Sequence, residues 1–398
     1  MEFAPFYIAT LPRIAFGSGG LAQLPGYVAE FGNEILLVTG AASFLSSHHW
    51  SALTTRLHDT GVRFHHVALQ GEPSPAFIDE IVQKWHGAPI HAVVGIGGGS
   101  VLDAAKAIAA LLPLGHSVMD YLEDVGRGLS YPGPSLPLIA VPTTAGTGSE
   151  ATKNAVLSEH GPAGYKKSFR HEKMVAKIAI VDPDLLEACP PHLIAAQGMD
   201  AFTQLLESYV SLRANPFTDA LAWSGLEAVA GGFMAAWHGG DGVDARRGRA
   251  AMAYGALLSG ITLAQVGLGS VHGLAQPLGS LFAIPHGVAC GTMVAAATAT
   301  NITALRQRQP GGQALAKYGR VGRVLSGEAG LSGHDACDRL VAMLEEWSTE
   351  MTLPRLGSYG ITEETIPAIV AASRNNSMKS NPVLLLDDEI ADMVRRRI

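Results

Sequence analysis

The sequence predicts an α/β domain built on a parallel sheet, followed by an all-α domain. Short β-rich runs alternate with helical patterns in the first half, which is typical of a parallel sheet covered by helices. After Asp182 and Pro183 we find no further strand pattern. Residues 250–305 contain no Asp, Glu, Lys or Arg, which indicates the interior of a domain. We therefore expect an α/β domain over residues 1–184 and a helical domain over 185–398.

The individual elements follow from apolar runs and helical periodicity. In the α/β domain the expected strands are 34–39, 63–69, 91–96, 136–141 and 176–181, and the expected helices between them are 50–60, 76–85 and 100–112. In the second domain the expected helices are 194–211, 216–236, 246–265, 313–325, 335–351 and 363–372.

The composition excludes several classes of protein. The 398-residue chain has 28 Lys and Arg against 35 Asp and Glu, so it lacks the basic surface of a nucleic-acid binder. His272, Gln276, Pro277, Pro285 and His286 interrupt the charge-free run, which argues against a membrane-spanning helix there. No signal-peptide pattern is evident, and three widely spaced cysteines predict neither a disulfide framework nor a thiolate zinc site. We expect a cytoplasmic protein with no nucleic-acid or membrane partner.

A glycine-rich turn follows the strand expected at 91–96. The segment HAVVGIGGGS runs directly into a helix. Glycines let the backbone approach a phosphate closely, and a helix N-terminus directs its N–H groups and dipole toward the anion. Gly98, Gly99 and Ser100 are therefore candidates for binding the pyrophosphate of a dinucleotide. The spacing is not that of the G-x-G-x-x-G fingerprint, so a tight turn without a ligand is the alternative.

A second loop, VPTTAGTGSEAT at 141–152, follows the next strand. The ligands of open α/β sheets collect at the carboxyl ends of the strands. Four hydroxyls in this loop can bind phosphate or ribose without adding charge: Thr143, Thr144, Thr147 and Ser149. A helix cap would explain one or two of them.

Carboxylate, amide and imidazole side chains mark a candidate metal site. Asp200 and Gln204 lie four residues apart, on one face of an expected helix. His272 and His286 would stand about 21 Å apart in a continuous helix, so we expect the two prolines between them to break it and bring the imidazoles together. The four side chains would then hold a divalent cation with a position open for a substrate oxygen. Hydrogen-bonded core histidines are the alternative.

Taken together, the motifs resemble the iron-containing (group III) alcohol dehydrogenases. The segments that carry the resemblance are GGGSVLDAAK at 97–106, PTTAGTGSEAT at 142–152, IVDPDL at 180–185, GMDAFTQ at 198–204, VHGLAQPLGSLFAIPHG at 271–287 and NPVLLLDDEI at 381–390. The resemblance implies a Rossmann-like dinucleotide-binding domain and a helical domain, the two-domain architecture shared with dehydroquinate synthase. It also implies NAD(P)-linked interconversion of alcohols and aldehydes or ketones by a cytoplasmic enzyme that is usually a homodimer.

The resemblance also assigns roles to single residues. The cofactor residues it implies are Gly98, Gly99 and Ser100 at the pyrophosphate, Asp103 supporting that turn, Thr143, Thr144, Thr147 and Ser149 on the nicotinamide side, and Lys166 near the ribose. Asp200, His272 and His286 match three of the family's four metal ligands.

Two glutamines depart from the family pattern. Gln204 stands where the family usually has the fourth ligand histidine, and Gln276 replaces a histidine near the nicotinamide. A glutamine carbonyl is a harder and weaker donor than imidazole, so affinity for Fe²⁺ or Zn²⁺ should fall. Some members, resembling maleylacetate reductases, work without metal. Burial of Asp200 with no cation nearby would be costly, which favours a bound metal.

Gly40 is a further departure. NAD-preferring relatives often place an aspartate after the first strand, where its charge repels the 2′-phosphate of NADP. Here Gly40 and Ser43 leave room for that phosphate. Both NAD and NADP are therefore allowed.

The working hypothesis is hydride transfer between the cofactor and a small alcohol or carbonyl compound in an interdomain cleft, with the substrate oxygen on the metal. The candidate catalytic residues are His272, His286 and Gln276, and an unligated histidine or a water relay would carry the proton. One alternative is a metal-independent carbonyl reductase in which Gln204 and Gln276 donate hydrogen bonds to the oxygen. Others are a lyase resembling dehydroquinate synthase and a binding module without catalysis.

Overall fold

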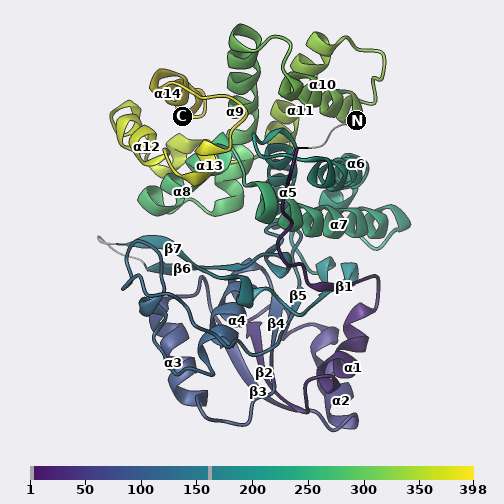
Figure 1. Cartoon of the computed structure of the whole chain (residues 1–398). Helices are drawn as coiled ribbons and strands as arrows, with labels where there is room; N and C mark the ends of the chain where they lie inside the picture. Colours follow the sequence, from purple (N-terminus) through teal and green to yellow (C-terminus); the bar gives the residue numbers. More distant parts are fainter. Residues whose placement is uncertain (1–3, 160–163) are drawn as a thin grey trace. The chain divides into compact units, whose positions relative to one another are not determined.

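The chain forms two compact units, and each is described by itself. The computed structural model describes residues 4–159 and 164–398 (Figure 1). The sheet unit comprises Ile8–Cys189 and Gly240–Ile261. The helical unit comprises Pro190–Gly239 and Thr262–Ile398, together with the described residues before Ile8.

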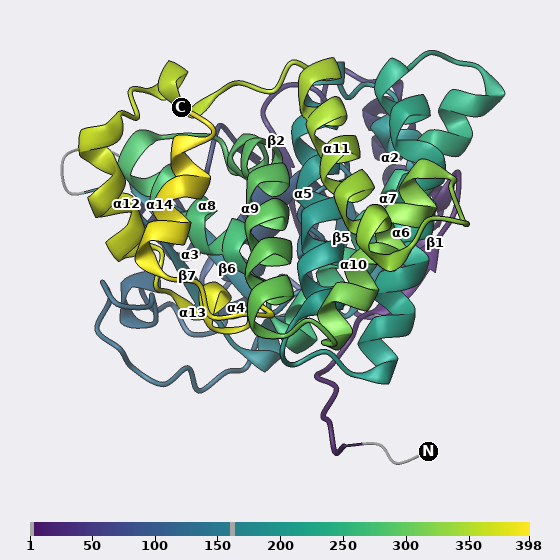
Figure 2. The ribbon, with the colours of Figure 1, turned by 90° about the horizontal axis from the view of Figure 1, so that it is seen from above.

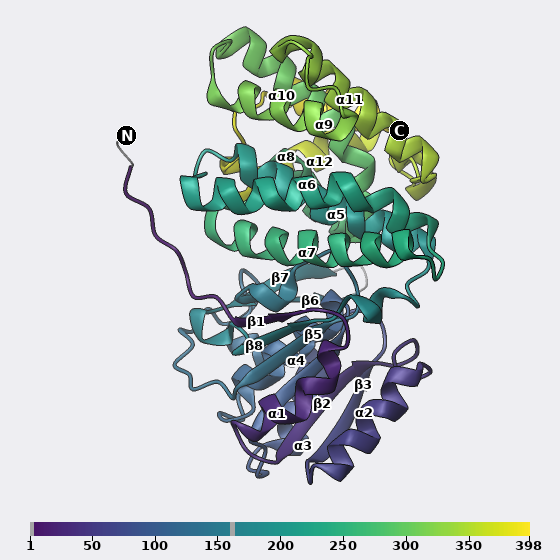
Figure 3. The ribbon, with the colours of Figure 1, turned by 90° about the vertical axis from the view of Figure 1, so that its right-hand side faces the viewer.

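Six parallel strands form the main sheet, in the order β1-β8-β5-β4-β2-β3 (Figures 1 and 3). Their bounds are β1 Arg13–Phe16, β2 Glu34–Gly40, β3 Arg63–Leu69, β4 Ala92–Gly97, β5 Leu138–Pro142 and β8 Ile178–Val181. The strands β4, β5 and β8 are buried throughout, which explains their continuous apolar runs. All five expected strands are confirmed, whereas the short, largely exposed β1 carries no pattern that predicts it.

Helices cover both faces of this sheet. They are α1 Leu24–Ala29, α2 His48–Asp59, α3 Pro75–Trp85 and α4 Gly99–Leu111. Successive side chains of β2 serve two cores: Ile35 and Leu37 pack with α1 and α2, whereas Leu36 and Val38 pack with α3 and α4. The glycine-rich turn thus connects a fully buried strand, β4, to a largely buried helix, α4.

An antiparallel hairpin completes the sheet unit. Its strands are β6 Asn154–Glu159 and β7 Tyr165–Arg170. Ala155, Leu157 and Phe169 join the same core as α3 and α4. No sequence pattern predicts this hairpin, because its strands are short and β7 carries three basic residues.

The helical unit is built from helices over its whole described length, as expected (Figure 2). They are α5 Pro191–Val210, α6 Pro216–His238, α8 Ser270–Phe282, α9 His286–Arg308, α10 Gln313–Ser326, α11 Gly333–Glu350, α12 Ile366–Ala372, α13 Asn376–Lys379 and α14 Asp387–Arg395, while α7 Val243–Val266 contributes residues to both units. The six helices expected in residues 185–398 are confirmed. The last of them, expected at 363–372, begins with a 3₁₀ turn, η7 Glu363–Thr365, and continues as α12.

The charge-free run, expected as the interior of the helical domain, is mostly buried, but its residues 250–261 belong to the sheet unit. It forms the end of α7, all of α8 and most of α9. By length and composition α9 could cross a membrane, but 83% of its most apolar window is buried inside the protein. Figure 2 shows α9 standing between α5 and α8. Helix α9 is therefore a core helix of the helical unit.

The expectation that both prolines break the helix is wrong for Pro277. Pro277 lies inside α8, and the break comes later, where Ala283 has a φ of 52° and Pro285 caps α9. A proline inside a helix leaves the carbonyl four residues earlier without its N–H partner. Here that carbonyl, of Gly273, accepts a hydrogen bond from Asn375 Nδ2 at 2.8 Å. The replacement partner explains why α8 continues through Pro277.

Candidate active site

The two candidate phosphate loops touch each other in the sheet unit. Gly98 is the N-cap of α4. A Cβ at Gly98 would lie 3.2 Å from a methyl carbon of Thr144, and one at Gly99 would lie 2.8 Å from that of Thr147. Such close approach leaves no room for a Cβ at Gly99 without a shift of Thr147, and only a tight fit at Gly98. The turn therefore forms a narrow cradle of backbone and hydroxyl groups at a helix N-terminus, which suits a phosphate.

Asp103 and Lys106 tie α4 to the second loop. Asp103 accepts hydrogen bonds from the Ser149 hydroxyl at 2.6 Å and from the Val156 N–H at 3.0 Å. Lys106 Nζ donates to the Ser149 hydroxyl at 2.9 Å and to the Thr152 hydroxyl at 3.0 Å. The Ser149 hydroxyl is thus engaged from both sides and supports the loop from within. Sequence reasoning missed Lys106, although a lysine on an otherwise apolar helix was a usable signal.

Three ionisable groups lie under this loop: Lys106 and Glu150 are buried, and the Asp103 side chain is 13% exposed. Burial raises the pKa of Asp103 and lowers the pKa of Lys106, and their opposite charges, 3.7 Å apart, partly offset both shifts. Burial also raises the pKa of Glu150 to about 7, against a smaller opposing effect of Lys106. The candidate cofactor loop therefore rests on a buried charge network.

Gly148 fixes the path of the same loop. It has a left-handed φ of 60°, and a Cβ there would lie 2.4 Å from the Cα of Gly260 in α7. Both the backbone angle and the close contact require glycine. This contact helps to explain why residues 240–261 belong to the sheet unit.

The remaining predicted cofactor residues lie at strand ends and on the hairpin. Gly40 is the last residue of β2, and a Cβ there would make only an ordinary contact, 3.8 Å from Val101. Lys166 lies on β7 and donates to Glu72 Oε1 at 2.5 Å. Ser100 lies in the first turn of α4, and Thr143 directly follows β5.

In the helical unit, α5, α8 and α9 bring four potential ligand atoms together. They belong to Asp200, His272, His286 and Cys290, and all lie within 4.8 Å of one another. Asp200 Oδ1 is 3.1 Å from His272 Nε2 and 3.6 Å from His286 Nε2. Carboxylate, imidazole and thiolate are ligands that divalent transition metals accept. The expected convergence of Asp200 with both histidines is present in the structure.

The cluster combines burial with strong electrostatic coupling. Burial by itself raises the pKa of Asp200, but the neighbouring His286 and His272 outweigh it and bring the pKa to about 2. Burial by itself lowers the pKa of His272, yet contacts with Cys290, Asp200 and Glu207 raise it well above the ordinary value. Burial raises the pKa of the Cys290 thiol to about 12. The His286 side chain is 37% exposed, so the cluster is open to solvent at that ring.

Glu207 orients the cluster, and sequence reasoning missed this role. Its carboxylate lies 2.7 Å from His272 Nδ1 and accepts the backbone N–H groups of Gly269 at 2.9 Å and Val271 at 2.6 Å. Glu207 therefore holds both the N-terminus of α8 and the imidazole ring of that helix. A sequence signal existed, because Glu207 lies seven residues after Asp200, on the same face of α5.

The two glutamines lie in different surroundings. Gln204 is buried on α5, one turn after Asp200. Gln276 is exposed on α8, one turn after His272. Cys290 was missed, although it lies four residues after His286 and therefore on the same face of α9.

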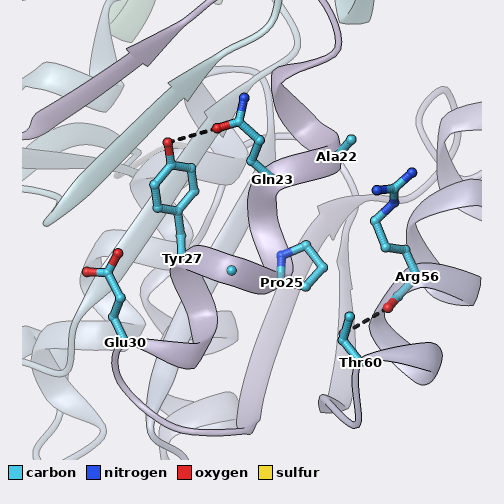
Figure 4. Close-up of a pocket in the computed structure, with 8 residues that line it drawn as sticks. Ala22, Gln23, Pro25, Tyr27, Glu30, Arg56 and Thr60 are labelled. Carbon is cyan, nitrogen blue, oxygen red and sulfur yellow. Dashed lines mark hydrogen bonds between the residues drawn. The ribbon is translucent and has the colours of Figure 1, made fainter.

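A surface pocket elsewhere in the sheet unit shares no residue with either candidate site. Figure 4 shows it between α1 and the end of α2, with Tyr27 donating to Gln23 at 3.2 Å and Thr60 donating to the Arg56 carbonyl at 2.8 Å. We assign no function to this pocket.

A parallel sheet with a glycine-rich strand-to-helix turn, together with a helical unit that carries a buried carboxylate–imidazole cluster, is typical of a cofactor-linked oxidoreductase. The sequence model of the family described as "Iron-containing alcohol dehydrogenase" matches residues 12–183, and that described as "Fe-containing alcohol dehydrogenase family, C-terminal" matches residues 194–398. The chain belongs to the iron-containing alcohol dehydrogenase family, which confirms the resemblance.

Individual relatives span almost the whole chain. Long-chain-alcohol dehydrogenase 1 of Geobacillus thermodenitrificans is 32% identical over 95% of this chain and 93% of the relative. NAD-dependent methanol dehydrogenase of Bacillus methanolicus is 28% identical over 97% of this chain and 98% of the relative. The crystal structure of a 1,3-propanediol oxidoreductase has a TM-score of 0.88 at 26% identity and covers 99% of this chain and 100% of that chain. These comparisons confirm the two-domain fold and an alcohol dehydrogenase activity.

Proposed function

We propose that this alcohol dehydrogenase interconverts small alcohols and their aldehydes or ketones with NAD or NADP and a divalent metal. The observation that carries the proposal is the convergence of Asp200, His272 and His286 in the helical unit. The relatives named above include an NAD-dependent methanol dehydrogenase and a long-chain-alcohol dehydrogenase, which supports alcohols as the substrate class. The proposal assigns cofactor binding to residues 1–184 and the metal and substrate to residues 185–398.

The cluster residues fit a divalent metal. Asp200, His272 and His286 would hold it, and a bound cation would stabilise negative charge on the substrate oxygen. His272 lies between Asp200 and Glu207, so its ring is fixed for binding rather than free to exchange protons with substrate. His286 has the more exposed ring and is the better candidate for proton exchange with solvent. Gln276 could assist only by hydrogen bonding.

The cradle between the two loops fits a dinucleotide. Backbone N–H groups at Gly98, Gly99 and Ser100 would hold the pyrophosphate, with the hydroxyls of Thr144 and Thr147 beside them. In this proposal Thr143 faces the nicotinamide side, Lys166 the ribose, and Asp103 and Ser149 support the loop. Gly40 leaves space for a 2′-phosphate, so NADP is accepted.

The test of this function combines turnover with metal content. Two-carbon to six-carbon aldehydes would be offered with NADH and with NADPH, before and after chelation, and with Fe²⁺, Zn²⁺ or Mn²⁺ added back. We expect Asp200→Ala to abolish turnover and metal binding but to leave cofactor affinity unchanged, because Asp200 lies outside the phosphate cradle. Glu364→Ala removes an exposed carboxylate and serves as the matched control. Unchanged turnover in Asp200→Ala would overturn the metal-dependent function.

The second candidate is a metal-independent carbonyl reductase. The observation that favours it is the buried amide of Gln204 next to Asp200, where the family usually has a ligand histidine. In that case Gln204 and Gln276 would donate hydrogen bonds to the carbonyl oxygen. Full activity after chelation, in protein shown by elemental analysis to be free of metal, would select this candidate.

We also propose a cytoplasmic homodimer. All three cysteines are free thiols, which agrees with a reducing compartment. The dimer follows from the family resemblance, and light scattering of the purified protein tests it. A mass of one chain, 41.6 kDa, would contradict it.

A further inference from the structure

Cys290 belongs to the candidate metal cluster, at a position that the sequence motifs did not identify as a ligand. Its Sγ is 3.6 Å from His272 Nε2 and 3.8 Å from His286 Nε2. The residue is fully buried, and it shares one face of α9 with His286. A buried thiol that contacts both imidazoles is positioned as a fourth donor.

We propose that the Cys290 thiolate is a protein ligand of the divalent metal and replaces the imidazole that is missing at position 204. The inference rests on the proposed function, because it requires a metal at Asp200, His272 and His286. It adds a sulfur atom to a site otherwise made of oxygen and nitrogen, and so changes which metal the site prefers.

The distances between donor atoms agree with tetrahedral coordination. Typical bond lengths of about 2.0–2.2 Å to nitrogen or oxygen and about 2.3 Å to sulfur place the donors of a tetrahedral site about 3.4–3.6 Å apart. The two sulfur–nitrogen distances are 3.6 and 3.8 Å, and the two oxygen–nitrogen distances are 3.1 and 3.6 Å. These four distances, with all four donor atoms within 4.8 Å of one another, are compatible with binding of one cation by all four side chains, and a substrate oxygen would then be a fifth ligand.

Charge balance also favours a thiolate ligand. The charges of a divalent cation, the Asp200 carboxylate and a Cys290 thiolate cancel within the ligand shell, and the buried Glu207 carboxylate adds one negative charge behind His272. On binding, the sulfur–hydrogen bond is replaced by a sulfur–metal bond and the proton leaves to bulk water. Sulfur favours Zn²⁺ or Co²⁺ over Mn²⁺ or Mg²⁺, because thiolate is the softer donor. Gln204 offers only an amide oxygen, which is the harder donor.

The experiment uses the whole protein loaded with Co²⁺ or Zn²⁺. We expect the wild-type Co²⁺ protein to show a thiolate-to-cobalt charge-transfer band in the near ultraviolet. We expect Cys290→Ser to lose that band while still binding Co²⁺, and to bind Zn²⁺ at least about tenfold more weakly, as loss of a soft ligand predicts. Cys337→Ser is the matched control, because Cys337 is also a buried thiol but lies on α11 and donates to the Leu315 carbonyl.

A second measurement needs no variant. X-ray absorption at the zinc edge of the wild-type protein should show one sulfur neighbour at about 2.3 Å. As a control, His48→Ala removes one ligand from a second group of potential ligands in the described part of the chain, His48, His49 and Glu187, which is more exposed and could bind metal adventitiously. The expected sulfur signal persists in that variant.

The outcomes separate the two proposals. Wild-type protein that binds no metal would overturn both the metal-dependent function and this inference. Metal that requires Asp200 but shows no sulfur neighbour, or a Cys290→Ser protein with unchanged band and affinity, would overturn the inference alone. In either of those cases Cys290 is a buried thiol beside the site and not a ligand.

Discussion

Glu207 Oε2 lies 2.7 Å from Nδ1 of His272, and this contact fixes the ring that faces Asp200. With the proton on Nδ1, the Nε2 lone pair points to the cluster and is available to a cation. The same carboxylate accepts the N–H groups of Gly269 and Val271, so one side chain sets the start of α8 and the direction of its imidazole. Glu207 is therefore a positioning residue for the candidate metal site.

Replacing Glu207 with glutamine should weaken metal binding. Glu207→Gln keeps the shape of the side chain but removes the negative charge that strengthens the Nδ1 hydrogen bond. We expect metal affinity to fall about 10–100-fold, the usual effect of losing such a partner. Competition with a chromophoric chelator measures this affinity, and Glu364→Gln is the exposed control. Equal affinity in Glu207→Gln and wild type would show that the contact only stabilises α8.

Loss of the Lys106 charge should destabilise the sheet unit. In Lys106→Met, Asp103 would stay buried without its partner 3.7 Å away, and the Ser149 and Thr152 hydroxyls would lose a donor. Breaking a buried pair on one side costs about 3–5 kcal/mol of unfolding free energy. Urea unfolding followed by circular dichroism measures the change.

The control for Lys106→Met is a lysine at the surface. Lys153→Met breaks a pair with Glu172 in which both side chains are at least 35% exposed, so the expected loss is below about 1 kcal/mol. Adding Asp103→Asn to Lys106→Met should recover part of the lost stability. Similar losses in Lys106→Met and Lys153→Met would refute the importance of burial.

Periodicity and apolar runs were enough to predict the sheet, because β2, β4, β5 and β8 are buried and read as continuous β-rich segments. The hairpin β6–β7 was not predicted, because buried and exposed residues alternate irregularly along its strands, which pair only with each other. The helical unit was predicted because helical contacts are local. The continuation of α8 through Pro277 was not predicted. It depends on a hydrogen bond from Asn375, about 100 residues later in the sequence, to the Gly273 carbonyl that Pro277 leaves without an N–H partner.

The candidate site was predictable where residue type alone signals chemistry. Asp200, His272 and His286 stood out as potential ligands, and the glycine and threonine loops as potential phosphate binders. Three residues were missed because their roles depend on partners far away in the sequence: Lys106, Glu207 and Cys290. Glu207 contacts His272 across 65 positions, Cys290 contacts His272 across 18, and Lys106 contacts Ser149 across 43. Their spacing on one helix face was visible, but spacing does not show which face is turned toward the site.

Buried Glu150 should make stability depend on pH. Its pKa is about 7 in the folded protein and 4.5 when exposed, so between these values the folded state holds a proton that the unfolded state has lost. The associated stability is complete below pH 4.5 and is lost as pH rises through about 7. Glu150→Gln stays neutral and should be more stable than wild type by about 2–3 kcal/mol at a pH above 8, with no gain at low pH.

Chemical unfolding at several pH values tests the effect of Glu150→Gln. Glu172→Gln serves as the control, because the Glu172 side chain is 44% exposed. The difference in stability between that variant and wild type should vary little with pH. A pH-independent difference for Glu150→Gln would mean that folding does not shift the pKa of Glu150.

Gly40 should control the choice between NADH and NADPH. A Cβ at this position would make an ordinary contact, 3.8 Å from Val101, so a side chain can start here without displacing α4. In the proposed cofactor site, Gly40→Asp places a negative charge where the 2′-phosphate of NADPH binds. We expect kcat/KM with NADPH to fall at least about tenfold, equivalent to about 1.4 kcal/mol, and the value with NADH to change little.

Gly330→Asp adds the same charge at an open surface position and controls for net charge. Because both cofactors share the pyrophosphate and nicotinamide, equal losses with NADH and NADPH would place the 2′-position away from β2.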